Sequence, residues 1–156
     1  MLAFMKLAQK VAVIAASYAD CDRARCLSPE RILDAAIGAG AAGVLIDTWV
    51  KDGRGLLRQL SVDALATWIL RARSAGLLTA LAGSLTADDL PILWDLQPDV
   101  VGVRGAACRH GRAGTLDLHR LLRLRATLDR VASSASRPLS GGELPEPGAH
   151  ILPLPR

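Results

Sequence analysis

Four short apolar runs recur along the chain, and each is largely continuous rather than alternating. They cover residues 10–18, 42–49, 77–85 and 99–107. Strands of a parallel sheet are usually covered on both faces, so they tend to be apolar at every position. The runs therefore predict four buried parallel strands.

The segments between the runs have helical spacing and recognisable starting residues. Ser28 and Pro29 predict an N-cap followed by a first helical residue, and Ser61 predicts a second N-cap. Serine suits this position because its side chain accepts a hydrogen bond from a free amide, whereas proline has no amide to satisfy. We expect Leu65 and Ile69 to face the core from the second of these helices.

Two further helices are predicted in the second half of the chain. One begins at Thr86 and is kinked or shortened by Pro91, because proline cannot continue the hydrogen-bond pattern of a helix. The other lies within residues 115–132. The apolar face expected for it consists of Leu118, Leu121, Leu122 and Leu128.

The order of strand and helix, repeated four times, predicts an α/β fold with a parallel sheet and right-handed crossovers. Either a barrel or an open doubly wound sheet fits this order, but four units are only half of the ~250 residues of a closed eight-stranded barrel. We expect one domain over residues 1–132. Residues 133–156 are rich in Pro, Gly and Ser without periodicity, which predicts a disordered tail.

Composition excludes several classes of function. The 156 residues carry a net charge of +4 that comes almost wholly from arginine. These arginines are scattered and have no aromatic neighbours to stack bases, so we expect no nucleic-acid partner. Three cysteines without framework spacing favour reduced thiols, no metal site and a cytoplasmic location. The apolar segment 11–19 has the length of a signal-peptide core, but its β-branched residues favour a strand, and no segment is long enough to span a membrane.

Polar residues follow all four predicted strands. Ligands of parallel α/β folds bind at the carboxyl ends of the strands, so these residues are the candidates for a site. Two of the strand ends combine glycine, a serine and an arginine, which is typical of a phosphate site but also of a simple tight turn. In chain order the candidates are Tyr18, Asp20, Asp47, Lys51, Gly83, Ser84, Arg104 and Gly105.

Asp47 is the most unusual of these candidates, because it ends an otherwise apolar strand. By the alternation of side chains along a strand it lies on the same side as Leu45, toward the mouth of a barrel. A structural acid that caps the loop or pairs with Arg54 is the alternative. Lys51 lies within reach of Asp47, and a nearby carboxylate favours the charged amine. Lys51 is therefore interpreted as a cationic clamp or proton donor rather than an amine nucleophile.

Taken together, these segments resemble the (5-formylfuran-3-yl)methyl phosphate synthase family of methanofuran-type cofactor biosynthesis. The resemblance rests on the strings AASYAD, VLIDTWVKDG, ALAGSL and DVVGVRGAAC in this order, and it extends over about residues 10–128. It implies a (β/α)8 TIM-barrel lyase that condenses two molecules of glyceraldehyde 3-phosphate into a phosphorylated furan aldehyde, without a bound cofactor or metal. It also implies catalytic roles for Asp47 and Lys51. Gly83, Ser84, Arg104 and Gly105 fall where such a barrel usually holds substrate phosphate.

The resemblance is to the C-terminal half of that family alone. Family members carry an N-terminal half with the Schiff-base lysine, which has no counterpart in this sequence. Half a barrel would expose two sheet edges and an apolar face. We therefore expect a homodimer or a separate N-terminal half-barrel as partner. A non-catalytic phosphometabolite-binding or assembly subunit and a truncated reading frame remain the alternatives.

Overall fold

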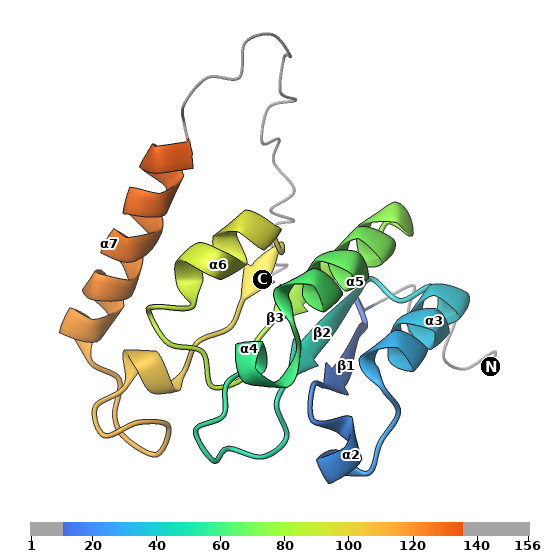
Figure 1. Ribbon diagram of the computed structural model, residues 1–156, viewed down its shortest axis with the longest axis horizontal. Coiled ribbons are helices and arrows are strands. Elements are labelled where there is room, and N and C mark those ends of the chain that lie inside the picture. Colours follow the sequence, from blue (N-terminus) through green and yellow to red (C-terminus); the bar gives the residue numbers. More distant parts are fainter. Residues whose placement is uncertain (1–10, 136–156) are drawn as a thin grey trace, which may run out of the picture.

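The computed structural model describes residues 11–135 (Figure 1). Four parallel strands form one sheet, and they neighbour one another in chain order, β1-β2-β3-β4. The elements are β1 (Ile14–Tyr18), α2 (Cys21–Ala24), α3 (Pro29–Ala39), β2 (Gly43–Asp47), α4 (Leu56–Gln59), α5 (Val62–Ser74), β3 (Leu78–Leu81), α6 (Leu90–Leu96), β4 (Val100–Val101), the 3-10 turn η1 (Gly105–Ala107) and α7 (Leu118–Ala135). The predicted α/β fold with four parallel strands is confirmed.

The two serine caps are confirmed. The Ser28 hydroxyl accepts a hydrogen bond from the Arg31 amide at 3.4 Å, with Pro29 in the first turn of α3. The Ser61 hydroxyl accepts from the Ala64 amide at 3.2 Å at the start of α5. These bonds satisfy amides that have no partner within the helix, so each helix begins at a defined residue.

The predicted start of the third helix is wrong. α6 begins at Leu90 rather than Thr86, because the Asp89 carboxylate accepts from the Thr86 amide at 2.7 Å and from its hydroxyl at 2.9 Å, which closes a separate turn. Pro91 then lies in the first turn of α6, where its missing amide costs nothing, so it does not kink the helix.

The apolar face predicted for the last helix is also partly wrong. Leu118 and Leu122 are exposed, whereas Leu124 is 6% exposed and packs with Leu121 and Leu128 in a small cluster around Leu90 and Ala107. The spacing of residues 121, 124 and 128 keeps all three on one side of the helix. α7 also continues through Ala135, beyond the expected domain boundary at 132. The predicted tail from 136 onward lies outside the described residues.

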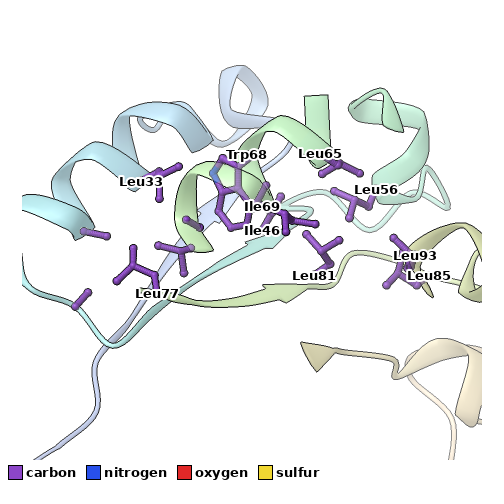
Figure 2. Close-up of a cluster of buried hydrophobic side chains, with 14 residues drawn as sticks. Leu33, Ile46, Leu56, Leu65, Trp68, Ile69, Leu77, Leu81, Leu85 and Leu93 are labelled. Atoms are coloured by element: carbon purple, nitrogen blue, oxygen red, sulfur yellow. The ribbon is translucent and has the colours of Figure 1, made fainter. Parts of the chain in front are cut away.

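The main core lies between the sheet and the helices that cover one of its faces (Figure 2). Ile46 and Leu81 contribute to it from the strands, and Leu65 and Ile69 from α5, as predicted. Trp68 is also buried, and its indole nitrogen donates to the Pro29 carbonyl at 3.2 Å, so α5 is linked to the start of α3. Burial of a Trp requires a partner of this kind for its N–H group.

The opposite face of the sheet is apolar and exposed. Ile14, Gly43 and Leu78 stand side by side on β1, β2 and β3, and Ile14 and Leu78 are 43% and 54% exposed. Val100, on β4, is 55% exposed. Side chains alternate between the two faces of a strand, so Asp47 belongs to this open face, four residues after Gly43.

Candidate functional site

Asp47 is the last residue of β2, at the carboxyl end of the sheet and opposite Tyr18 of β1. Its carboxylate accepts a hydrogen bond from the Thr48 amide at 2.7 Å, which fixes the side chain against the backbone. The side chain is 32% exposed. The carboxylate is therefore oriented and reachable from solvent, and the described ion pairs join it to Lys51 and not to Arg54.

Lys51 turns back toward the end of β2 and binds three oxygen atoms. Its ammonium donates to Asp47 Oδ1 at 2.7 Å, to Thr48 Oγ1 at 3.2 Å and to the Thr48 carbonyl. An ammonium group has three donors and no acceptor, so all three of its N–H groups are engaged. The predicted ion pair between Asp47 and Lys51 is present, and the three hydrogen bonds fix the position of the amine.

Asp20 supports the loop that carries Lys51. It lies at the end of β1, is 5% exposed, and accepts from the Trp49 amide at 2.6 Å and the Val50 amide at 2.9 Å. Burial alone would raise the pKa of Asp20, but the two amide hydrogen bonds outweigh it, so its pKa is lowered. A carboxylate ionised in this way ties the loop after β2 to the end of β1.

Tyr18 takes part in the same support. Its ring stacks edge-on against Trp49 with centroids 5.3 Å apart and planes at 69°. Edge-to-face contacts of this kind hold two aromatic side chains in a fixed geometry. Tyr18 and Asp20 thus lie beside the loop that carries Lys51, and neither lines the pocket at the ends of the strands.

Gly83 and Ser84 form a tight turn after β3. Gly83 has φ +117, and a Cβ atom placed on it would lie 2.9 Å from the Thr48 backbone nitrogen and 2.8 Å from Thr48 Cγ2. Its carbonyl accepts from the Leu56 amide at 2.9 Å. Only glycine fits this close approach between the β2 and β3 exits. The helix expected to begin directly after the turn starts at Leu90, so its dipole does not act there.

Arg104 and Gly105 follow β4, as predicted. Arg104 precedes η1, and its side chain is exposed. A Cβ atom on Gly105 would lie 3.7 Å from the Arg112 backbone nitrogen, so the segment that follows folds back over this turn. The sequence predicts a phosphate cup at these two strand ends, and the structure brings both ends to one pocket.

A single pocket of about 830 Å³ unites Asp47 and Lys51 with both strand ends. It contains six of the eight predicted residues, the exceptions being Tyr18 and Asp20. Sequence reasoning missed three cations in its lining, which are Arg112, Arg120 and Arg123. The spacing of Arg120 and Arg123 on a predicted helix was the available signal, but nothing in the sequence places that helix against α6 and η1 at the edge of the pocket.

Between residues 11 and 135 no group of His, Cys, Asp and Glu is arranged to hold a metal ion. No helix in that range is long and apolar enough to cross a membrane. Cys21, Cys26 and Cys108 are free thiols.

The fold and pocket define an α/β protein with a strand-end site suited to an anionic ligand. Residues 2–125 match the model of the 4-HFC-P synthase family, and the chain belongs to that family. The (5-formylfuran-3-yl)methyl phosphate synthase of Methanopyrus kandleri is 44% identical over 99 residues, which are 64% of this chain and 42% of that protein. The enzyme of the same name from Methanobrevibacter smithii is 43% identical over 107 residues, which are 69% of this chain and 45% of that protein.

A Kitasatospora aureofaciens relative, which bears the same name provisionally, is 40% identical over 122 residues. That match covers 77% of this chain and 49% of the relative, so the chain spans about half the length of the curated relatives it matches. Among solved structures, a phosphoribosyl anthranilate isomerase from Thermus thermophilus has a TM-score of 0.43 and 16% identity over 85% of this chain and 68% of that one. That overlap supports no conclusion about activity.

Proposed function

We propose that this chain supplies the C-terminal half of a (β/α)8 barrel that acts as a (5-formylfuran-3-yl)methyl phosphate synthase. The observation that carries the proposal is the one pocket that joins Asp47 and Lys51 to the Gly83 turn and Arg104. The names of the curated relatives supply the reaction class. Free thiols at the three cysteines support a cytoplasmic location.

The proposed reaction condenses two molecules of glyceraldehyde 3-phosphate, with loss of one phosphate and of water, to a phosphorylated furan aldehyde. In this reaction Asp47 exchanges protons with the bound triose, because its carboxylate is oriented by the Thr48 amide and partly open to the pocket. Lys51 holds negative charge that develops beside it. Gly83, Ser84, Arg104 and Gly105 bind substrate phosphate.

The Schiff-base amine of this scheme comes from a second half-barrel. Lys51 is the single lysine among residues 11–135, and its three N–H groups bind Asp47 and Thr48. A lysine attacks a carbonyl through an amine that is free to approach it, and the bonds to Asp47 and Thr48 hold this amine in place. We therefore assign the nucleophilic amine to a separate polypeptide segment.

The exposed apolar face of the sheet supports a partner at this place. In a closed barrel the side chains of this face would fill the interior. We propose that a second copy of this chain or a separate N-terminal half-barrel covers the face. Leu78→Glu is then expected to reduce the mass measured by light scattering or to abolish binding of the added half. Leu70→Glu, at a residue on α5 that is 63% exposed, is the matched control and leaves assembly unchanged.

The activity test supplies the proposed N-terminal half-barrel in trans. The full chain is mixed with the N-terminal half of a curated relative and glyceraldehyde 3-phosphate, and released phosphate and ultraviolet absorbance of the furan are followed. Asp47→Asn should lower the rate by about 10²-fold or more, as expected on loss of a general acid or base. Asp52→Asn is the control, since Asp52 pairs with Arg23 outside this pocket. Equal rates for the Asp47 and Asp52 variants would refute the role of Asp47.

A non-catalytic phosphometabolite-binding subunit is the second candidate. The observation that favours it is the full engagement of the Lys51 amine, which leaves the described pocket with cations but no free amine for a Schiff base. It predicts binding of glyceraldehyde 3-phosphate that weakens in Arg104→Ala, measured by calorimetry, without turnover in the completed barrel. Turnover that depends on Asp47 would exclude this candidate.

A further inference from the structure

Four arginines line the pocket without a carboxylate partner among the described residues, and they are Arg104, Arg112, Arg120 and Arg123. Two arginines from the same segments but outside the pocket are paired, Arg109 with Asp117 and Arg125 with Asp129. Among the residues described, one carboxylate lines the pocket, that of Asp47, and it binds Lys51. The pocket therefore gathers positive charge that the described side chains do not balance.

The loop that carries Arg112 is closed over the turn after β4. The Arg109 amide donates to the Thr115 carbonyl at 2.9 Å, and the Asp117 amide donates to the Ala107 carbonyl at 2.9 Å. The Arg112 backbone nitrogen lies against Gly105, close enough that a Cβ atom on that glycine would be in ordinary van der Waals contact with it. These contacts hold Arg112 at the rim of the pocket rather than in a free loop.

The start of α7 is anchored in the same way. Asp117 is 7% exposed, and its carboxylate accepts from the Arg120 amide at 3.0 Å and binds the Arg109 guanidinium. The hydrogen bond with Arg109 lowers the pKa of Asp117, so the anchor stays ionised near neutral pH.

Packing of the buried Leu124 determines which side of α7 faces the pocket. Arg120 and Arg123 are three residues apart and share a side of the helix. Leu124 is buried beside them in the cluster with Ala107, and it lines the same pocket. The two guanidinium groups are exposed on a helix whose position is fixed by packing.

We propose that Arg112, Arg120 and Arg123 form a second phosphate-binding site in this pocket, beside the one at Arg104 and the glycine turns. Guanidinium groups bind phosphate oxygens in pairs of parallel hydrogen bonds, and three of them match a phosphate dianion. The proposal rests on the proposed function, because condensation of two triose phosphates brings two phosphate groups into one pocket. The competing occupant is an acidic surface of a partner half-barrel.

The test uses phenylglyoxal, which modifies accessible arginines, with inorganic phosphate as the probe. The full chain is labelled with and without phosphate at equal ionic strength, and each arginine is quantified by peptide mass spectrometry. Labelling of Arg112, Arg120 and Arg123 should fall by about tenfold when phosphate is at ten times its Kd, since only the unbound fraction reacts. Arg31, which is exposed on α3 outside the pocket, is the internal control and stays labelled.

Two variants show whether there are two sites or one. In Arg104→Ala, phosphate should still protect Arg120 and Arg123, and in the double variant R120A/R123A it should still protect Arg104. Loss of protection at Arg120 and Arg123 in Arg104→Ala would overturn the proposal in favour of one shared site. No protection of the three arginines in the unsubstituted chain would overturn it in favour of a protein partner. Protection does not depend on turnover, so absence of furan synthesis would refute the proposed function alone.

Discussion

The turn at Gly83 makes a quantitative prediction about how the site is built. Gly83→Ala places a methyl group in a residue with φ +117, at 2.8 Å from Thr48 Cγ2 and 2.9 Å from the Thr48 nitrogen. Thr48 is fully buried and accepts hydrogen bonds from Lys51, so it cannot move aside freely. Nor can the turn move, because the Gly83 carbonyl accepts from the Leu56 amide.

Two effects add up in this variant. A side chain held in a sparsely populated backbone region costs about 1–3 kcal/mol. Insertion of a methyl group into packed surroundings costs about 1–3 kcal/mol more. We therefore expect Gly83→Ala to lower the free energy of unfolding by about 2–6 kcal/mol. Gly53→Ala separates the two effects, since Gly53 has φ +87 but no atom within 4 Å of its Cβ position. Gly53→Ala should therefore lower the free energy of unfolding by the backbone effect alone, about 1–3 kcal/mol.

The free energy of unfolding is measured by urea titration, followed by the fluorescence of the three tryptophans, of which Trp68 is buried, and by far-ultraviolet circular dichroism. The Gly83 variant should have a lower midpoint than the Gly53 variant at an unchanged slope. Gly38→Ala, in α3 at a position with open space around it, should match or exceed the stability of the original chain. Equal losses for Gly83→Ala and Gly53→Ala would refute the claim that the β3 exit packs against Thr48.

Two further predictions concern stability. Leu33→Ala should lower the free energy of unfolding by about 2–5 kcal/mol in urea titration, because Leu33 is 0% exposed. The exposed Leu118, replaced by Ala, should change it by less than about 0.5 kcal/mol, and similar values for the two would contradict the assigned core. Asp20→Asn should destabilise the chain at neutral pH. Because the folded pKa of Asp20 is lowered, its contribution is present above the ordinary value of 3.8 and is lost as the pH falls through the folded value. The difference from the unsubstituted chain should therefore shrink in titrations below about pH 4, and a difference that stays constant down to low pH would contradict the role of the Asp20 carboxylate.

The sequence predicted what depends on local rules. Continuous apolar runs, serine caps and strand-end polar residues all follow from spacing within a few residues, and the structure contains the corresponding elements. The ion pair of Asp47 and Lys51 was predictable because only four positions separate them. The start of α6 was not, since the Thr86 to Asp89 turn competes with a helix over the same residues and its hydrogen bonds prevail.

The rest of the site depends on contacts between distant segments. Arg112, Arg120 and Arg123 reach the pocket because η1 and α7 pack on the same small core, which no local pattern reveals. Asp20 was selected from its place at a strand end, but its bonds to the Trp49 and Val50 amides join residues 29 and 30 positions away. Strand ends therefore identify candidates, and long-range packing decides which of them line the pocket.

The bonds from Asp20 to the loop after β2 have a consequence for the proposed assembly with a partner. Asp20 and the two amides that it binds belong to the same chain as the Asp47 and Lys51 pair. The support of this pair therefore needs no partner. A partner that binds the open face would therefore meet an arrangement that is already rigid. Association would lose little conformational freedom in this loop, which favours tight binding even by a small interface. In the proposed barrel, the partner would then have to meet one geometric requirement, which is to place its amine at a fixed position beside Asp47 and Lys51.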